Sequence, residues 1–150
     1  MTQSLTRLIV HAIFSTNNRE PMLPAEVRPE LYAYIGGILK SLGCVPLSIS
    51  GTNDHVHLLF ILSKTIPLAK VFEEVKGTSS QWIKTQPGVS KTFAWQGGYG
   101  AFSVSESQRE KVSEYIARQE EHHRKLTFKE ELLTLFQKHH IEYDEKYLWT

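Results

Sequence analysis

The stretch GTNDHVHLLFIL, residues 51–62, decides the fold. Its first four residues are a turn cluster, and the β-forming run that follows predicts a strand over residues 55–62. CVPLSIS, residues 44–50, predicts a second strand, so the two strands form a hairpin. Because side chains alternate along a strand, His55 and His57 project from one face, while Val56 and Leu58 face the helical layer.

The rest of the chain supplies further strands and helices around this hairpin. Strands are predicted over residues 8–15 and 93–104, the second interrupted by glycines. Apolar spacing predicts helices over residues 24–42, 67–84, 105–125 and 128–139. The third helix is expected to begin with a capping box of Ser105 and Gln108.

This order of elements, β-α-β-β-α-β-α, predicts an α+β fold of the ferredoxin-like, split βαβ kind. We expect an antiparallel sheet of about four strands, with strand 55–62 among its neighbours. Helices would cover one face of the sheet. The other face would stay open and carry the active site.

Length and composition indicate one cytoplasmic domain. The 150 residues are expected to form a single unit, with residues 128–150 as its C-terminal helix and tail. The sequence has no apolar run long enough to cross a membrane, and its N-terminus lacks the cleavage site of a signal peptide. Cys44 is the sole cysteine, which excludes an internal disulfide and a cysteine zinc site. The net charge of +1 argues against a large duplex-DNA footprint, but not against binding a short single strand.

Two pairs of residues suggest chemistry. The imidazoles of His55 and His57 would project together and could chelate a divalent metal, although an isolated His-x-His is more often a surface pair. Tyr115 and Gln119 lie four residues apart on one helical face. A tyrosine can attack a phosphodiester and hold it covalently, although a lone tyrosine on an amphipathic helix usually packs.

Taken together, these motifs resemble a known family. The GTNDHVHLLF hairpin, the segments VFEEVKGTSSQWIK and FAWQGGYGAFSVSES, and YIARQEEHH are similar to the single-tyrosine HUH transposases, including the REP-associated tyrosine transposases. The resemblance covers roughly residues 8–127. A His-hydrophobic-His strand followed by a Tyr-x-x-x-Gln helix is far more specific than either part alone.

The resemblance implies an activity and roles for residues. Tyr115 would be the nucleophile, and His55, His57 and Gln119 would bind Mg²⁺ or Mn²⁺. Two imidazoles and an amide oxygen leave positions for a phosphate oxygen and water. The protein would cleave and rejoin single-stranded DNA at insertion-sequence ends through a 5′-phosphotyrosine. No nucleotide cofactor is expected, because the phosphotyrosyl bond conserves the energy of the broken bond and the sequence has no Walker motif.

Other residues are candidates for contacts around such a site. The candidate phosphate contacts are Lys70, Lys76, Lys84 and Arg118, with Arg109, Lys111, Arg124 and Lys125 near the third helix. Trp95 or Tyr99 is the candidate for stacking on a base. A charged helix face is more often solvated. His122 and His123 could support the metal, contact phosphate or face solvent. His11 is expected to pack in the core or at the surface. Asp54 is expected to form the turn before the strand, and support of a metal ligand from behind is the weaker alternative.

The resemblance also implies a homodimer that acts on single-stranded DNA with hairpin ends. A two-fold pair would supply two tyrosines, and strand 93–104 is the candidate for edge-to-edge pairing. Two alternatives remain: a replication-type HUH nickase, and a domesticated, non-catalytic nucleic-acid-binding protein. The absence of a helicase domain disfavours the first, and the intact motif residues disfavour the second.

Overall fold

A four-stranded antiparallel sheet forms the centre of the molecule. The computed structural model describes residues 2–123 and 125–149. The strands are β1 (Ile9–Ser15), β2 (Val45–Gly51), β3 (His55–Ile61) and β4 (Gly100–Val104), in the order β2-β3-β1-β4. Every pairing in the sheet is antiparallel. The predicted α+β class and the central place of the His-x-His strand are confirmed.

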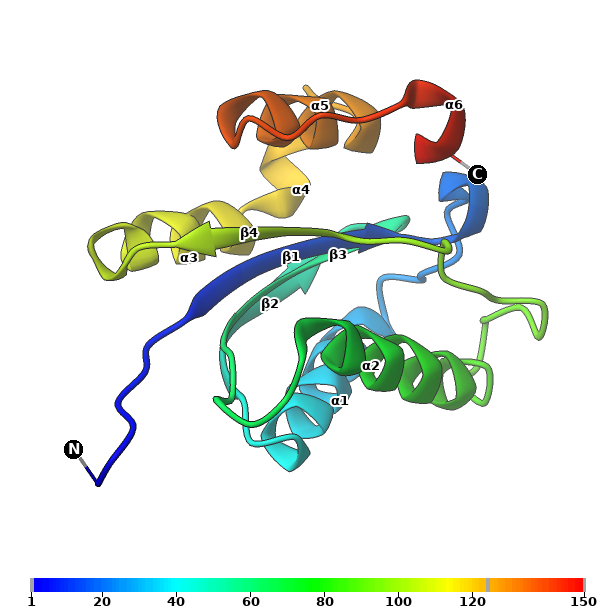
Figure 1. Ribbon diagram of the computed structural model, residues 1–150. Helices are drawn as coiled ribbons and strands as arrows, with labels where there is room; N and C mark the ends of the chain where they lie inside the picture. The colour runs from blue at the N-terminus through cyan, green and yellow to red at the C-terminus, as the bar shows by residue number, and fades with distance from the viewer. Residues whose placement is uncertain (1, 124, 150) are drawn as a thin grey trace.

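Two helices, α1 (Arg28–Ser41) and α2 (Leu68–Ile83), cover one face of the sheet (Figure 1). Alternate residues of β3 point into this layer, and Val56, Leu58 and Phe60 are all fully buried in its core. On α1, Leu31, Ile35 and Leu39 recur every four residues and form the facing stripe. This layer fixes which side chains of β3 remain for the opposite face.

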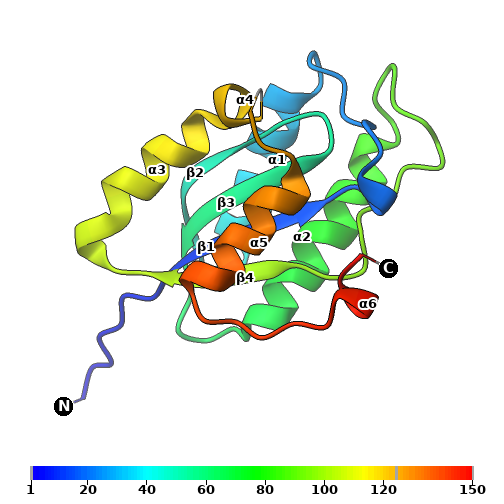
Figure 2. The ribbon, with the colours of Figure 1, turned by 90° about the horizontal axis from the view of Figure 1, so that it is seen from above.

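That opposite face is not open, contrary to expectation. Three helices lie over it: α3 (Arg109–Ala117), α4 (Gln119–His122) and α5 (Phe128–Lys138) (Figures 1 and 2). A last short helix, α6 (Glu145–Leu148), follows. Two 3₁₀ turns, η1 (Asn17–Arg19) and η2 (Glu106–Gln108), complete the elements. His55 and His57 are therefore 0% exposed rather than displayed on a bare sheet.

An apolar cluster holds α5 on the sheet. Phe128, Leu132 and Phe136 of α5 pack on Ile13 of β1 and Phe102 of β4. The helix begins with a complete capping box, in which the Thr127 hydroxyl accepts from the Glu130 amide and the Glu130 carboxylate accepts from the Thr127 amide. These contacts place one turn of α5 directly above the histidines.

A small residue at position 100 allows this close approach. A Cβ added to Gly100 would lie 3.0 Å from Ile13 Cγ2 and 3.3 Å from Leu132 Cδ1. Both neighbours are packed side chains, so neither has room to retreat. Gly100 thus brings the backbone of β4 close to α5.

Two predicted boundaries were wrong. The third helix is not continuous from residue 105 to 125: it ends at Ala117, and α4 begins at Gln119. Arg118 between them has φ −101° and ψ 27°, outside the helical range. Ser105 makes no cap, and η2 precedes the helix instead.

The fourth predicted strand, 93–104, is also shorter than expected. Only Gly100–Val104 forms the strand, and Trp95 makes an isolated bridge to Thr16. The glycine pair between these segments interrupts the ladder. Within the described ranges, no helix combines the length and apolarity needed to span a bilayer.

We expect Gly51→Ala to disrupt the hairpin that carries the histidines. The new Cβ would lie 2.2 Å from the His55 carbonyl oxygen and 2.9 Å from Val56 Cα, and backbone atoms cannot move aside cheaply. The free energy of unfolding should fall by about 2 kcal/mol in urea denaturation. Gly97→Ala is the matched control, because its Cβ would meet open space. Equal stability of the two variants would contradict this account.

Candidate active site

The strand register brings both predicted histidines to the covered face. His55 pairs with Ser15 and His57 with Ile13 across the β1–β3 ladder. The Nε2 atom of His55 lies 3.2 Å from Gln119 Oε1. The Nε2–H of His57 donates to Glu131 Oε1 at 2.9 Å. The two imidazoles therefore point away from the sheet and toward the overlying helices.

The predicted tyrosine and glutamine reach the same place. Tyr115 is half-buried near the end of α3, and its hydroxyl donates to Glu131 Oε2. Gln119 is fully buried, and its Nε2 donates to the Tyr115 carbonyl oxygen at 3.3 Å. All four predicted residues thus converge within one chain. Within this chain, the helix that carries Tyr115 lies over the sheet that carries its own histidines.

The sequence analysis missed one residue, Glu131. Its side chain is buried on α5 and contacts both halves of the site. Its Oε1 accepts from His123 Nε2 at 3.0 Å and lies 3.5 Å from His55 Nε2. A signal was present: Glu131 is three residues after Phe128, on the apolar face of its helix. A carboxylate at such a position is seldom buried without partners.

His123 was left between three interpretations, and the structure places it in the cluster with Glu131. His122 contacts Tyr115 instead, with ring centroids of the two side chains 4.5 Å apart. The Nε2 atom of His122 is buried and finds no hydrogen-bond partner among the described residues.

Outer partners hold the two central imidazoles by their other nitrogens. Asp54 Oδ1 lies 2.7 Å from His55 Nδ1, and Thr52 Oγ1 lies 2.9 Å from the same atom. His11 Nε2 lies 2.8 Å from His57 Nδ1. For Asp54 and His11 the simpler interpretations, turn and packing, were favoured, and the structure gives each a direct contact with a histidine. Such contacts fix ring orientation and leave Nε2 available to a ligand.

Burial and hydrogen bonding give His55 and His57 different charge states. Burial lowers the pKa of His57 to about 4 and that of His11 to about 3, so both are neutral at pH 7. Burial also opposes the charged form of His55, but its hydrogen bonds to Asp54 and Glu131 outweigh burial and raise its pKa to about 9. The cationic His55 therefore balances a buried carboxylate.

That carboxylate and the phenol also depart from their ordinary values. Burial would raise the pKa of Glu131, but hydrogen bonds from His123, His55 and His57 hold it well below its usual range. Burial and the neighbouring carboxylate raise the pKa of Tyr115 well above its usual value. At neutral pH the site holds an ionised Glu131 and a protonated Tyr115 joined by a hydrogen bond.

The donor set fits a divalent cation. One ligand atom from each of His55, His57, His123 and Glu131 can be chosen so that all four lie within 4.8 Å of one another. The Gln119 Oε1 atom adds an amide oxygen beside His55. Imidazole nitrogen and carboxyl or amide oxygen are donors that Mn²⁺ accepts, and Mg²⁺ favours the oxygens.

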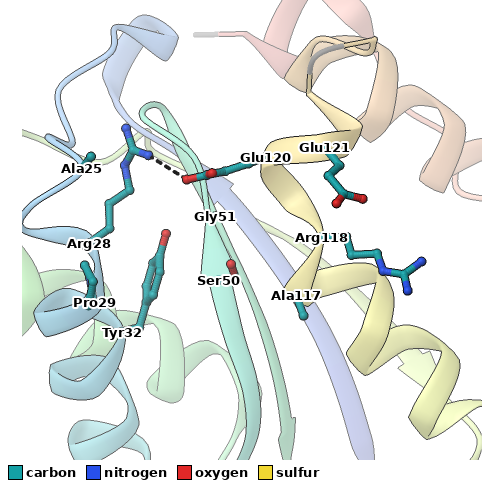
Figure 3. Close-up of a pocket in the computed structure, with 10 residues that line it drawn as sticks. All are labelled: Ala25, Arg28, Pro29, Tyr32, Ser50, Gly51, Ala117, Arg118, Glu120 and Glu121. Carbon is teal, nitrogen blue, oxygen red and sulfur yellow. Dashed lines mark hydrogen bonds and ion pairs between the residues drawn. The ribbon is translucent and has the colours of Figure 1, made fainter.

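One cavity opens on this cluster, and a second lies at the α3–α4 junction. The larger, about 740 Å³, opens between α3 and α5 and is lined by Tyr115, Glu131 and His11, with Lys111 and Lys138 among its other residues. The second, about 330 Å³, lies between α1, the end of β2 and the α3–α4 junction (Figure 3). Arg28 and Glu120 pair across it at 3.3 Å, and Arg118 lines it. Tyr115 thus lines the larger cavity.

The candidate DNA contacts are scattered. Lys70, Lys76 and Lys84 lie on or just after α2, the helix on the far side of the sheet from the site (Figure 1). Lys70 pairs with Glu73 and Glu74, and Lys76 donates to the Gln96 and Gly98 carbonyls. Lys111 lines the cavity beside Tyr115, Arg118 lines the second cavity, and Arg124 falls outside the described residues.

The two aromatic candidates differ in exposure. Trp95 is in the core, where its indole N–H donates to the Ser79 hydroxyl and its ring packs between Phe14 and Phe93. The structure therefore places Trp95 away from the surface. Tyr99 is 40% exposed and stacks on Phe72 with ring centroids 3.7 Å apart. One face of the Tyr99 ring is thereby occupied.

Comparisons with known proteins agree with this geometry. The model of the IS200-like transposase family matches residues 4–119. A crystal structure of a provisionally assigned transposase from Deinococcus radiodurans is 24% identical, with a TM-score of 0.61 over 77% of this chain and 93% of that one. A REP-associated tyrosine transposase bound to a REP hairpin is 12% identical, with a TM-score of 0.60 over 81% of this chain and 72% of that one. At these identities the two structures show the fold alone. No curated protein matches the chain.

We expect the metal-free protein to be most stable near pH 6.5. Below it, His11 and His57 take up protons in the unfolded chain but not in the folded one, so stability falls toward pH 4. Above it, the raised pKa of His55 makes the folded chain hold the extra proton, so stability falls toward pH 9. Urea denaturation with a chelator present should show a loss of roughly 4 kcal/mol between pH 6.5 and 4.5.

The matched control for this profile is His140→Asn, on the exposed surface. It should keep the same dependence on pH. A profile that is flat from pH 4.5 to 6.5 would contradict the assigned charge states.

Proposed function

The chain belongs to the family of IS200-like transposases, and from that premise we propose that it cleaves and rejoins single-stranded DNA at insertion-sequence ends. Tyr115 is the proposed nucleophile, and a divalent cation, Mg²⁺ or Mn²⁺, assists. One observation carries the proposal: the Tyr115 hydroxyl, His55, His57 and Gln119 meet in one cluster although they come from three separate elements, β3, α3 and α4. Packing alone does not require that convergence.

The cation's ligands would be His55, His57 and Gln119. When bound, it would polarise the scissile phosphate and stabilise the charge that develops there. The chain itself orients the two imidazoles. Asp54 contacts His55 Nδ1 and His11 contacts His57 Nδ1, so each ring is held with Nε2 toward the cluster.

Tyr115 performs the covalent step. Its phenolic oxygen attacks phosphorus as the bond from phosphorus to the 3′ oxygen breaks. The downstream strand remains as a 5′-phosphotyrosine, and the upstream strand leaves with a free 3′ hydroxyl that ends with the proton from the phenol. A second 3′ hydroxyl then attacks the phosphotyrosine and rejoins the strands, so no nucleotide cofactor is consumed.

The cavity beside Tyr115 supports a single strand as the substrate. Its 740 Å³ suit a nucleotide or two of unpaired strand, and Lys111 and Lys138 can meet phosphates. Arg118 is the best placed of the other candidate contacts. The hairpin in the structure of the REP-associated relative supports a folded DNA end as the natural ligand.

A homodimer is the proposed assembly. β4 is an edge strand of the sheet, and its sequence, GAFSV, carries no charge. Because Tyr115 reaches the histidines of its own chain, we propose that pairing brings together two nucleophiles.

Incubation with Mn²⁺ and single-stranded DNA from the flanks of the protein's own gene, labelled at the 3′ end, should yield a covalent adduct on a denaturing gel. The label must be 3′ because the 5′ phosphate of the downstream strand stays on the protein. Tyr115→Phe should abolish the adduct, and chelation should prevent it. Tyr143→Phe, a partly exposed tyrosine away from the cluster, is the matched control and should leave it unchanged. An adduct that survives in Tyr115→Phe would overturn the assignment.

Asp54→Ala should weaken Mn²⁺ binding about 10- to 100-fold, because His55 loses the partner that orients its ring. Calorimetric titration of the metal-free protein measures the change. Asp144→Ala is the control, because the Asp144 carboxylate caps α6 by accepting from the Lys146 amide. Equal affinities in these two variants would show that Asp54 serves the turn alone.

A further inference from the structure

The two oxygens of Glu131 face different partners. Oε1 is within 3.5 Å of the Nε2 atoms of His57, His123 and His55. Oε2 accepts from the Tyr115 hydroxyl and lies 3.5 Å from Gln119 Nε2. One carboxylate therefore lies between the imidazole cluster and the nucleophile.

The position of Glu131 is built by its helix. Phe128 and Leu132 on either side are anchored in the apolar cluster, and the Phe128 ring lies 5.0 Å from that of His55. The flanking residues force the carboxylate inward, where it is 2% exposed. Burying a carboxylate is costly unless it is paired and hydrogen-bonded, and here every close partner belongs to the site.

The family match does not reach this helix, because it ends at Gln119. Glu131 therefore lies outside the residues that the family model matches. It comes from a different element than any of the four residues that the motif predicts.

We propose that Glu131 couples the cation site to the nucleophile. Its Oε1 would join His55, His57 and Gln119 as a cation ligand, with His123 beside it, and its Oε2 positions the Tyr115 hydroxyl. This inference rests on the proposed function, since it requires both a bound cation and Tyr115 as the nucleophile.

The chemistry of the donors favours this role. The motif's ligands are two imidazoles and an amide, and none of these groups supplies negative charge. Hard cations such as Mg²⁺ and Mn²⁺ favour carboxylate oxygen, and Glu131 supplies it at the centre of the cluster. Its second oxygen then fixes the distance between cation and phenol through a single rigid group.

The first test is Mn²⁺ binding by calorimetry on the full chain. Glu131→Gln, which keeps the shape of the side chain, should lower the affinity at least ~10-fold. Glu130→Gln is the matched control: it removes a charge from the neighbouring position, and glutamine can keep the capping box. That control should stay within about twofold of the native chain. Thermal unfolding of each variant checks that it is folded.

The second test needs neither cation nor DNA. In metal-free protein carrying ¹³C-labelled tyrosine, the Tyr115 ring resonance, assigned from its loss in Tyr115→Phe, should shift in Glu131→Gln and stay in place in Glu130→Gln. If Glu131→Gln fails to fold, Glu131→Asp replaces it. The shorter side chain keeps the charge, so it should bind Mn²⁺ more tightly than an alanine variant and still shift the Tyr115 resonance.

Adduct formation completes the test. Glu131→Gln should slow the adduct about 10- to 100-fold. Variants at Glu131 that bind Mn²⁺ as tightly as the native chain, or form adduct as fast or faster, would overturn the inference. The carboxylate would then only fill space in the site. If the native chain itself bound no Mn²⁺ and gave no Tyr115-dependent adduct, the proposed function would fall and this inference with it. These results are distinguishable because the native chain and the variants are measured side by side.

Discussion

The alternation of side chains along β3 is the constraint on which the molecule depends. Val56, Leu58 and Phe60 are buried against α1 and α2, while His55 and His57 are buried on the other side. A shift of the strand by one residue would put the imidazoles into an apolar core and the aliphatic side chains into the polar cluster. The strand is paired on both edges, and the turn at Gly51 sets where it starts, so that shift is excluded.

The helices over the site each bring one kind of group to this fixed strand. Tyr115 comes from the end of α3, and Gln119 comes from the start of α4 after the break at Arg118. Glu131 comes from α5, which is held by apolar contacts with β1 and β4 rather than by backbone hydrogen bonds. The polar cluster and the apolar cluster therefore both stabilise the packing of α5 on the sheet. A substitution in one cluster should also alter the geometry of the other.

The sequence was sufficient wherever the determining forces are local. A β-forming run after a turn cluster predicted β3, helical spacing predicted α1 and α2, and both sets of boundaries agree with the structure to within a few residues. The roles of His11 and Glu131 were not accessible in this way. His11 reaches His57 only because β1 pairs with β3 in one particular register, and Glu131 reaches the site only because α5 docks above it. Trp95 and the break at Arg118 likewise depend on tertiary packing, which propensity does not encode.

Charge balance connects the fold to the proposed chemistry. A buried carboxylate needs a positive neighbour, and in the metal-free chain protonated His55 supplies it. A divalent cation would compete with that proton for the same nitrogen, and binding would release the proton. The exchange substitutes one positive group for another against the same Glu131 oxygen, so the site need not be rebuilt when a cation enters. On the proposed function, the fold therefore keeps its cation site assembled in advance, and the half-buried phenol stays aligned beside it throughout.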